Sequence, residues 1–175
     1  GRYINLPESL RVIRQYGGVC LKKNSASDRE NDASTEKKVS AGLREMSMEL
    51  PVPGILESPF GVFESKIFSY KKQKIEEKKY TKWMDYDKIK NSLLIRNRQP
   101  GDYFVLDETG RTQKLKQYFV NEKILKEQRD TIPLVADGAH ILWIVGYRIS
   151  AYYKVSSTTK TILEIQYYGG REDNE

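Results

Sequence analysis

Apolar and polar residues alternate in short runs through the first half of the chain, a pattern typical of strands rather than helices. From Leu10 to Tyr16 the alternation is partial, Gly17-Gly18 offers a turn, and Val19 to Leu21 resumes the apolar run. We therefore expect two short strands within residues 3 to 23, paired as a hairpin. The stretch from Phe60 to Tyr70 is rich in aromatic and β-branched residues and predicts a longer strand.

Residues 24 to 42 interrupt this pattern, because they contain almost no large apolar side chain. Such a segment cannot bury enough surface to offset the entropy lost on ordering. We expect a mobile surface loop within a β-rich lobe that covers residues 1 to 90.

Helical spacing first occurs in the second half of the chain. Leu115, Tyr118 and Phe119 fall on one face at i, i+3 and i+4, which predicts a helix from Lys114 to Val120. A second short helix should begin at Lys126 and end before Pro133, because the residue ahead of a proline avoids the helical conformation.

Apolar runs around these helices predict a small sheet. Strands are expected at Leu93 to Ile95, at Leu134-Val135, at Ile141 to Gly146 and at Ile162 to Tyr167. Trp143 lies inside such a run and is interpreted as core. The fold class is therefore α+β: a β-rich N-terminal lobe, then a C-terminal domain over residues 91 to 168 with two short helices on a small mixed sheet, then a frayed tail over residues 169 to 175.

The charge balance favours polyanionic partners. Lys and Arg number 30 against 24 Asp and Glu, which gives a formal net charge of +6 and a pI near 9.2. Nucleic acid is the first candidate partner and an anionic membrane the second, although a lysine-rich solvated surface would look the same. No apolar run is long enough to span a bilayer, and no signal peptide is found at Gly1, so we expect no membrane association and a cytoplasmic location.

The chain holds little material for catalysis. Cys20 is its only cysteine, which excludes an internal disulfide and a Cys-based zinc site. His140 is its only histidine, so a mononuclear His/Cys metal centre or a Ser-His-Asp triad has almost no raw material. His140, beside a predicted turn, is interpreted as polar surface. We expect no catalytic and no metal-binding residues in this sequence.

Basic residues occur at nearly every predicted junction of the second half, where a scaffold presents side chains to partners. They could pair with RNA phosphates. Alternatives remain open: Arg96 and Arg98 could pair with Asp102, Lys154 could belong to a plain surface turn, and the lysines between 71 and 82 could form a solvated hairpin rim. The candidate contacts are Arg96, Arg98, Lys114, Lys116, Lys123, Lys126, Arg129, Arg148 and Lys154.

The order of motifs in this half is distinctive. Along the chain it runs Arg96-x-Arg98-x-x-Gly101-Asp102, Lys114-Leu115-Lys116-x-x-Phe119, Lys123, Arg129-Asp130-x-x-Pro133-Leu134, Ile141-x-Trp143-x-x-Gly146-x-Arg148 and Lys154-Val155. This order resembles the C-terminal domain of bacterial tRNA(Ile)-lysidine synthetase over roughly residues 91 to 168. Residues 1 to 90 are similar more loosely, at Leu6-Pro7 and Val52-Pro53-Gly54. The family commonly has Asp where this chain has Asn121 and Pro where it has Leu125.

The resemblance implies a function. The whole enzyme uses ATP, with Mg²⁺, and lysine to convert the wobble cytidine of the isoleucine tRNA with a CAU anticodon to lysidine, and its C-terminal region holds that tRNA. The family's adenylating loop, Ser-Gly-Gly-x-Asp-Ser, is absent from these 175 residues. We therefore expect the chemistry, and its ATP, in an N-terminal domain outside this sequence, and no activity from this chain alone.

The resemblance also implies a fold likeness to a domain of the phenylalanyl-tRNA synthetase β chain. The oligomeric state is left open, a homodimer included. The rival hypothesis is a non-catalytic module that docks a protein partner or another domain of the same enzyme.

Overall fold

The computed structural model describes residues 3–6, 10–15, 18–23, 46–76 and 78–169, which form three sheets. The first sheet is antiparallel, with the order β1-β2-β3. The predicted hairpin is confirmed as the β2–β3 pair, but β1 adds a third strand to the two expected. These strands are β1 (Tyr3–Leu6), β2 (Leu10–Gln15) and β3 (Gly18–Lys23). The predicted mobile loop of residues 24 to 42 lies outside the described residues.

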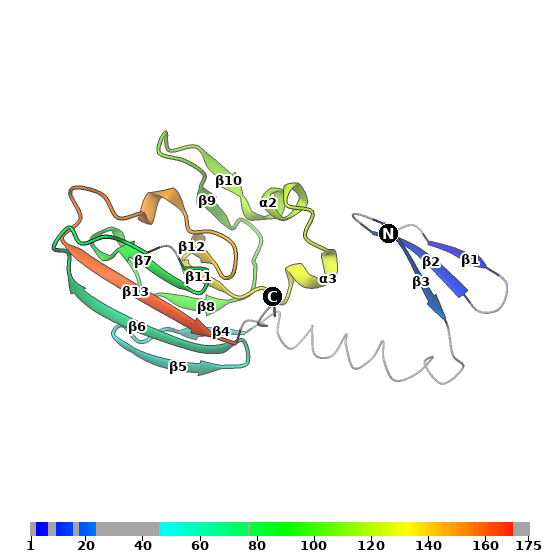
Figure 1. Ribbon diagram of the computed structural model, residues 1–175, viewed down its shortest axis with the longest axis horizontal. Helices are drawn as coiled ribbons and strands as arrows, with labels where there is room; N and C mark the ends of the chain where they lie inside the picture. Colours follow the sequence, from blue (N-terminus) through cyan, green and yellow to red (C-terminus); the bar gives the residue numbers. More distant parts are fainter. Residues whose placement is uncertain (1–2, 7–9, 16–17, 24–45, 77, 170–175) are drawn as a thin grey trace.

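The second sheet has four antiparallel strands in the order β5-β6-β13-β7. Its longest strand β6 matches the aromatic and β-branched run of the sequence. The strand made last, β13, lies between β6 and β7 (Figure 1). The bounds are β5 (Gly54–Ser58), β6 (Gly61–Ser69), β7 (Thr81–Asp85) and β13 (Thr161–Tyr168).

The third sheet has six strands in the order β10-β9-β12-β11-β8-β4. It is mixed, because β12 runs parallel to β9 while the other pairs are antiparallel. The expected α+β class with two short helices is confirmed. The bounds are β4 (Ser47–Glu49), β8 (Leu94–Arg96), β9 (Tyr103–Val105), β10 (Thr112–Lys114), β11 (Leu134–Asp137), β12 (His140–Ile144), α2 (Leu115–Asn121) and α3 (Lys126–Arg129), with two single-turn 3₁₀ helices, η2 (Tyr86–Lys88) and η3 (Ala151–Tyr153).

The predicted boundary between residues 90 and 91 does not divide these two sheets. Strand β13, from the expected C-terminal domain, pairs with β6 and β7 of the expected N-terminal lobe. Conversely, β4 of the N-terminal lobe pairs with β8 of the C-terminal domain. The core is shared as well, since Phe63 and Met84 pack in one buried cluster with Trp143. The core interpretation of Trp143 is confirmed, because its side chain is fully buried.

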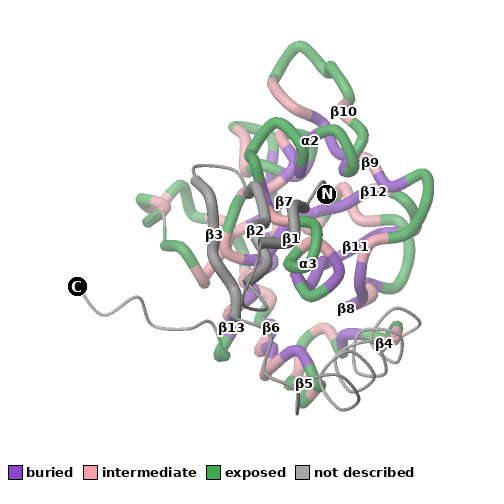
Figure 2. Tube along the Cα trace, turned by 90° about the vertical axis from the view of Figure 1, so that its right-hand side faces the viewer, coloured by how far each residue is buried: buried purple, intermediate pink, exposed green. Residues whose placement is uncertain are grey.

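A second buried cluster lies under α2. Leu115, Tyr118 and Phe119 are the buried residues of this helix, which confirms the predicted face, and they pack against Phe104 and Leu134. Figure 2 shows buried positions along β11 and β12 and exposed positions on the outer side of α2. No helix within the described ranges is long and apolar enough to cross a bilayer.

The connection between α2 and α3 keeps the geometry that proline would impose. Leu125 has φ −59°, close to the value of about −65° at which a proline ring fixes the backbone. Leu125 therefore has a backbone φ that a proline at this position could also adopt.

Candidate nucleic-acid interface

Arg96 is not a surface residue. Its guanidinium is 2% exposed and makes a two-pronged contact with the Asp102 carboxylate, at 2.9 and 2.8 Å. It also donates to the carbonyls of Asn97 and Gly138. Burial of a charge requires such pairing, and both terminal nitrogens of the guanidinium are occupied by these partners. Of the two alternatives left open, the pair with Asp102 is the one found, and the tRNA-contact interpretation of Arg96 was wrong.

Two further candidates serve the packing of α3. Arg98 donates through Nε to Asp130 at 2.6 Å, and Arg129 donates through Nε to the carbonyl of Ile124 at 2.9 Å. Both side chains are half-buried. Asp130 is 8% exposed, and its carbonyl accepts a hydrogen bond from the Asn97 amide. These arginines join the β8 turn to α3 and reach the surface only in part.

Four candidate lysines stand on the surface around α2 and α3. Lys114 precedes α2, Lys116 lies on its outer side, Lys123 follows it, and Lys126 begins α3. All four are exposed. Among the described residues none of them has a carboxylate partner within 4.0 Å. We call these four exposed lysines around α2 and α3 the helix face; the exposed Glu122 and Glu127 lie on the same two helices or directly after them.

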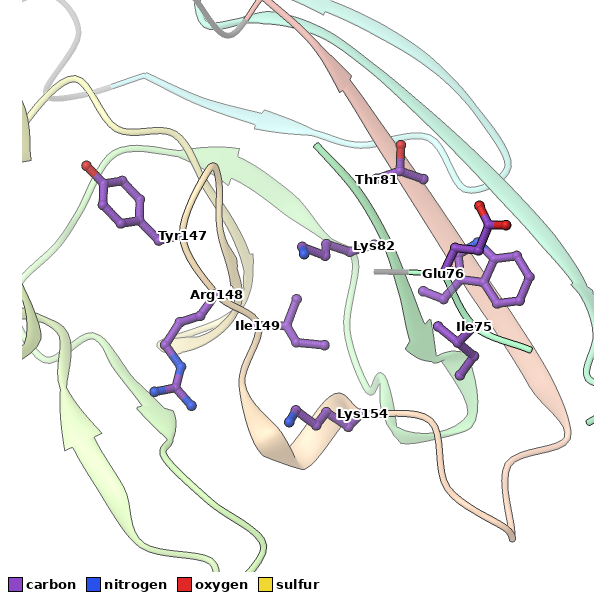
Figure 3. A pocket seen from close by; sticks show the side chains of 9 residues that line it. Ile75, Glu76, Thr81, Lys82, Tyr147, Arg148, Ile149 and Lys154 are labelled. Carbon is purple, nitrogen blue, oxygen red and sulfur yellow. The ribbon is translucent and has the colours of Figure 1, made fainter. Parts of the chain in front are cut away.

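The other two candidates, Arg148 and Lys154, line a cavity of about 230 Å³. The cavity lies between the edge strand β7 and the segment 147–154 (Figure 3). Lys82 lines it too, and belongs to the lysine cluster for which the sequence left phosphate contact open. The full lining is Ile75, Glu76, Thr81, Lys82, Trp83, Tyr147, Arg148, Ile149 and Lys154.

The guanidinium of Arg148 is anchored rather than mobile. Its Nη2 donates to the Leu106 carbonyl at 2.7 Å, and its Cζ lies 5.2 Å from the centre of the Phe104 ring. Its Nε is buried and makes no hydrogen bond in the described structure. The guanidinium of Arg148 is therefore held in a fixed position against Leu106 and Phe104, whereas Lys154 is exposed.

The turn at Tyr147 connects the cavity to the helix face. Gly146 adopts φ +80°, and Tyr147 is 43% exposed. Burial of its hydroxyl raises the pKa of Tyr147, on which the charges of Lys79 and Glu122 also act. Because Glu122 directly follows α2 and Lys79 lies just ahead of β7, this turn stands between the two basic regions.

The aromatic residues of the cavity, Trp83 and Tyr147, were missed by the sequence reasoning. Trp83 directly follows Lys82, and Tyr147 directly precedes Arg148. This adjacency to a basic residue is the signal that could have pointed to them.

His140 differs from the polar surface residue that was expected. Its ring stacks on Tyr103 at 4.8 Å, and its Nε2 lies 3.0 Å from the Ser150 hydroxyl. Burial lowers the pKa of His140 from its ordinary value, which favours the neutral ring, while the charge of Asp137 acts in the opposite direction. Within the described part of the chain no three His, Cys, Asp or Glu side chains come together as metal ligands.

Comparisons with known proteins all point to the same protein family. Residues 93–166 match a family model described as the TilS substrate C-terminal domain. The chain is 34% identical to the tRNA(Ile)-lysidine synthase of Caldanaerobacter subterraneus subsp. tengcongensis over 94% of this chain and 32% of that protein. It is 31% identical to the tRNA(Ile)-lysidine synthase of Clostridium tetani over 99% of this chain and 35% of that protein. The chain thus spans about a third of the length of the curated relatives it matches.

A solved structure is similar as well. The crystal structure of a TILS C-terminal domain superposes with a TM-score of 0.60 and 31% identity, and the match covers 71% of this chain and 97% of that one.

Proposed function

Because this chain belongs to the tRNA(Ile)-lysidine synthase family, as a match to its C-terminal domain, we propose that it binds tRNA and positions it for modification. The observation that carries the proposal is the helix face. Its exposed lysines have no carboxylate partner among the described residues, so their charge is available to an RNA backbone. A-form RNA presents phosphates and 2′-hydroxyls more readily than base edges, so this surface would recognise mainly shape.

For the whole protein we propose the reaction that its relatives' name describes. ATP would activate the wobble cytidine of the isoleucine tRNA with a CAU anticodon, and lysine would then replace the activating group to give lysidine. ATP and Mg²⁺ would bind outside this chain, which has no adenylating loop. A cytoplasmic location and a fold likeness to a domain of the phenylalanyl-tRNA synthetase β chain belong to the same proposal.

The test is a salt titration of tRNA affinity for the parent chain and for the double variant Lys114→Ala, Lys116→Ala. Phosphate contacts release counterions, so the slope of log affinity against log salt should flatten by roughly 0.7 to 0.9 for each phosphate that the variant no longer neutralises. The melting temperature should change little, because exposed lysines rarely contribute more than about 0.5 kcal/mol to stability.

The matched control is Lys66→Ala, Lys160→Ala, which changes the net charge equally at two exposed lysines on and next to the four-stranded sheet. This control should leave most of the slope intact. If the parent binds tRNA but the helix-face variant keeps the parental slope, the helix face does not contact phosphate. If the parent does not bind tRNA at all, the rival docking module gains.

A further inference from the structure

The tight turn that follows β12 carries an exposed aromatic side chain, that of Tyr147. The Tyr147 amide donates to the Ile144 carbonyl at 2.9 Å, and Gly146 supplies the left-handed backbone, at φ +80°, that closes the turn. The Ile144 amide in turn donates to the Arg148 carbonyl at 2.9 Å. Tyr147 is 43% exposed, so a backbone fixed by hydrogen bonds on both sides holds this ring at the surface.

Arg148 fixes this turn against the elements that carry the helix face. Its Nη2 donates to the Leu106 carbonyl, in the connection between β9 and β10, and its guanidinium lies over the Phe104 ring. Phe104 in turn meets Tyr118 of α2 edge-on, at 5.2 Å between ring centroids. The turn with Tyr147 and the helix with its surrounding lysines are therefore parts of one packed unit, and their relative position is set before any RNA binds.

The hydroxyl of Tyr147 makes no hydrogen bond within the part of the chain that the structure describes. The buried Tyr153 and Tyr167, by contrast, donate theirs to the Asp137 carboxylate and the Phe60 carbonyl. Figure 3 shows the hydroxyl end of Tyr147 directed away from the other side chains of the cavity. A phenolic hydroxyl can both donate and accept, so this one is available to a ligand in either role.

The charges around this hydroxyl favour a neutral partner over a phosphate. Burial raises the pKa of Tyr147, the positive charge of Lys79 lowers it, and Tyr80 and the carboxylate of Glu122 raise it further. Opposite charges therefore act on the hydroxyl from two sides, and neither sign prevails strongly enough to select an anion. The neutral polar group of an RNA backbone is the ribose 2′-hydroxyl, which also donates and accepts.

We propose that the Tyr147 hydroxyl forms a hydrogen bond with a ribose 2′-hydroxyl of the RNA whose phosphates the helix face holds. The proposal rests on the proposed function and adds a selectivity that lysines do not provide. Ammonium groups bind the phosphates of DNA and RNA alike. The 2′-hydroxyl exists only in RNA, and the wide, shallow minor groove of an A-form helix displays it. Tyr147 is thus the residue by which this surface distinguishes RNA from DNA.

The test compares two duplexes that differ only at the 2′ position. A short RNA duplex and its 2′-fluoro counterpart share the A-form and the phosphate charge, but the second lacks the hydroxyl. The parent chain should bind the RNA duplex about 2- to 13-fold more tightly, the range that corresponds to one hydrogen bond. Tyr147→Phe removes only the hydroxyl, so it should bind both duplexes as weakly as the parent binds the 2′-fluoro duplex. The matched control is Tyr152→Phe, at 40% exposure, which should keep the parental ratio.

The salt dependence of binding should be the same for both duplexes and all three chains, because no phosphate contact is removed. If the parent binds tRNA but binds the two duplexes equally, or if Tyr147→Phe still distinguishes them, Tyr147 does not contact the 2′-hydroxyl and tRNA binding stands. An equal loss of affinity for both duplexes in Tyr147→Phe would overturn the proposal as well. If the parent binds neither tRNA nor either duplex, the proposed function itself fails, and the role of Tyr147 fails with it.

Discussion

Replacement of Arg96 by Ala should lower the stability of the fold and should affect RNA binding only through unfolding. The side chain is 2% exposed and makes four hydrogen bonds, two of them to Asp102. Its removal leaves the buried Asp102 carboxylate with the backbone amide of Gln99 as its remaining donor. The carbonyl of Gly138 also loses its hydrogen bond from Arg96, so the link between β8 and the turn that joins β11 to β12 is broken.

The magnitude follows from the burial. Removal of one partner of a buried ion pair costs about 3 to 5 kcal/mol, because the other charge is left uncompensated. For a protein of this size each kcal/mol corresponds to roughly 2 to 4 °C in melting temperature. We therefore expect the melting temperature to fall by about 6 to 20 °C. The double variant Arg96→Met, Asp102→Leu should recover much of this stability, since apolar replacement of both partners is often nearly neutral.

Urea denaturation followed by circular dichroism gives the free energy of unfolding of each variant. The matched control is Arg111→Ala, which removes an arginine from a pair with Asp107 whose arginine side chain is 71% exposed. This variant should melt almost like the parent, because water and salt screen an exposed pair. A parental melting curve for Arg96→Ala together with weaker tRNA binding would refute the reasoning and return Arg96 to the RNA-contact residues.

Three other predictions concern the core, the one histidine and the chemistry. Leu115→Ala, at 1% exposure, should cost roughly 2 to 5 kcal/mol in urea denaturation; a smaller cost would mean that the core under α2 closes over the gap. The imidazole of His140 should titrate by NMR below 6.5, because burial disfavours its charged form. The unfolded chain then binds the proton more readily, so the free energy of unfolding should fall as the pH drops below about 6.5, and His140→Gln should flatten that fall; a pKa above 6.5 would contradict this. Finally, this chain with ATP, lysine and tRNA should release no pyrophosphate above background, since it has no adenylating loop, and steady release would show a catalytic site that the sequence does not reveal.

Local sequence patterns predicted the helices and strands well, but they did not predict which strands pair with one another. The spacing of Leu115, Tyr118 and Phe119 identifies the buried face of α2, because helical periodicity is a property of neighbouring residues. The pairing of β13 with β6 joins residues such as Ile165 and Ser65. Alternation in a strand tells which residues share a face and says nothing about which strand lies alongside, so the boundary at residue 90 was placed in the middle of a shared structure.

The sequence predicted which residues of the candidate site are charged, but not which of them are buried. Arg96 and Lys116 look equivalent in sequence, since both are basic residues near an element end. Only the turn that brings Asp102 back to Arg96 distinguishes a buried pair from a surface cation. Trp83 was missed because an aromatic residue in a strand is normally core, and its place on the edge strand β7 follows from a pairing that the sequence does not reveal.

The central place of β13 also determines when this fold can form during synthesis. A ribosome that has reached Lys160 has delivered β5, β6 and β7, yet β7 has β13 as its only strand neighbour in the described structure. Until Tyr168 has emerged, the facing edges of β6 and β7 stay unpaired, and unpaired edges on a nascent chain invite aggregation. A premature stop before Thr161 would therefore remove the middle of the four-stranded sheet rather than its margin, and the cavity beside β7 is assembled only when translation of β13 is complete.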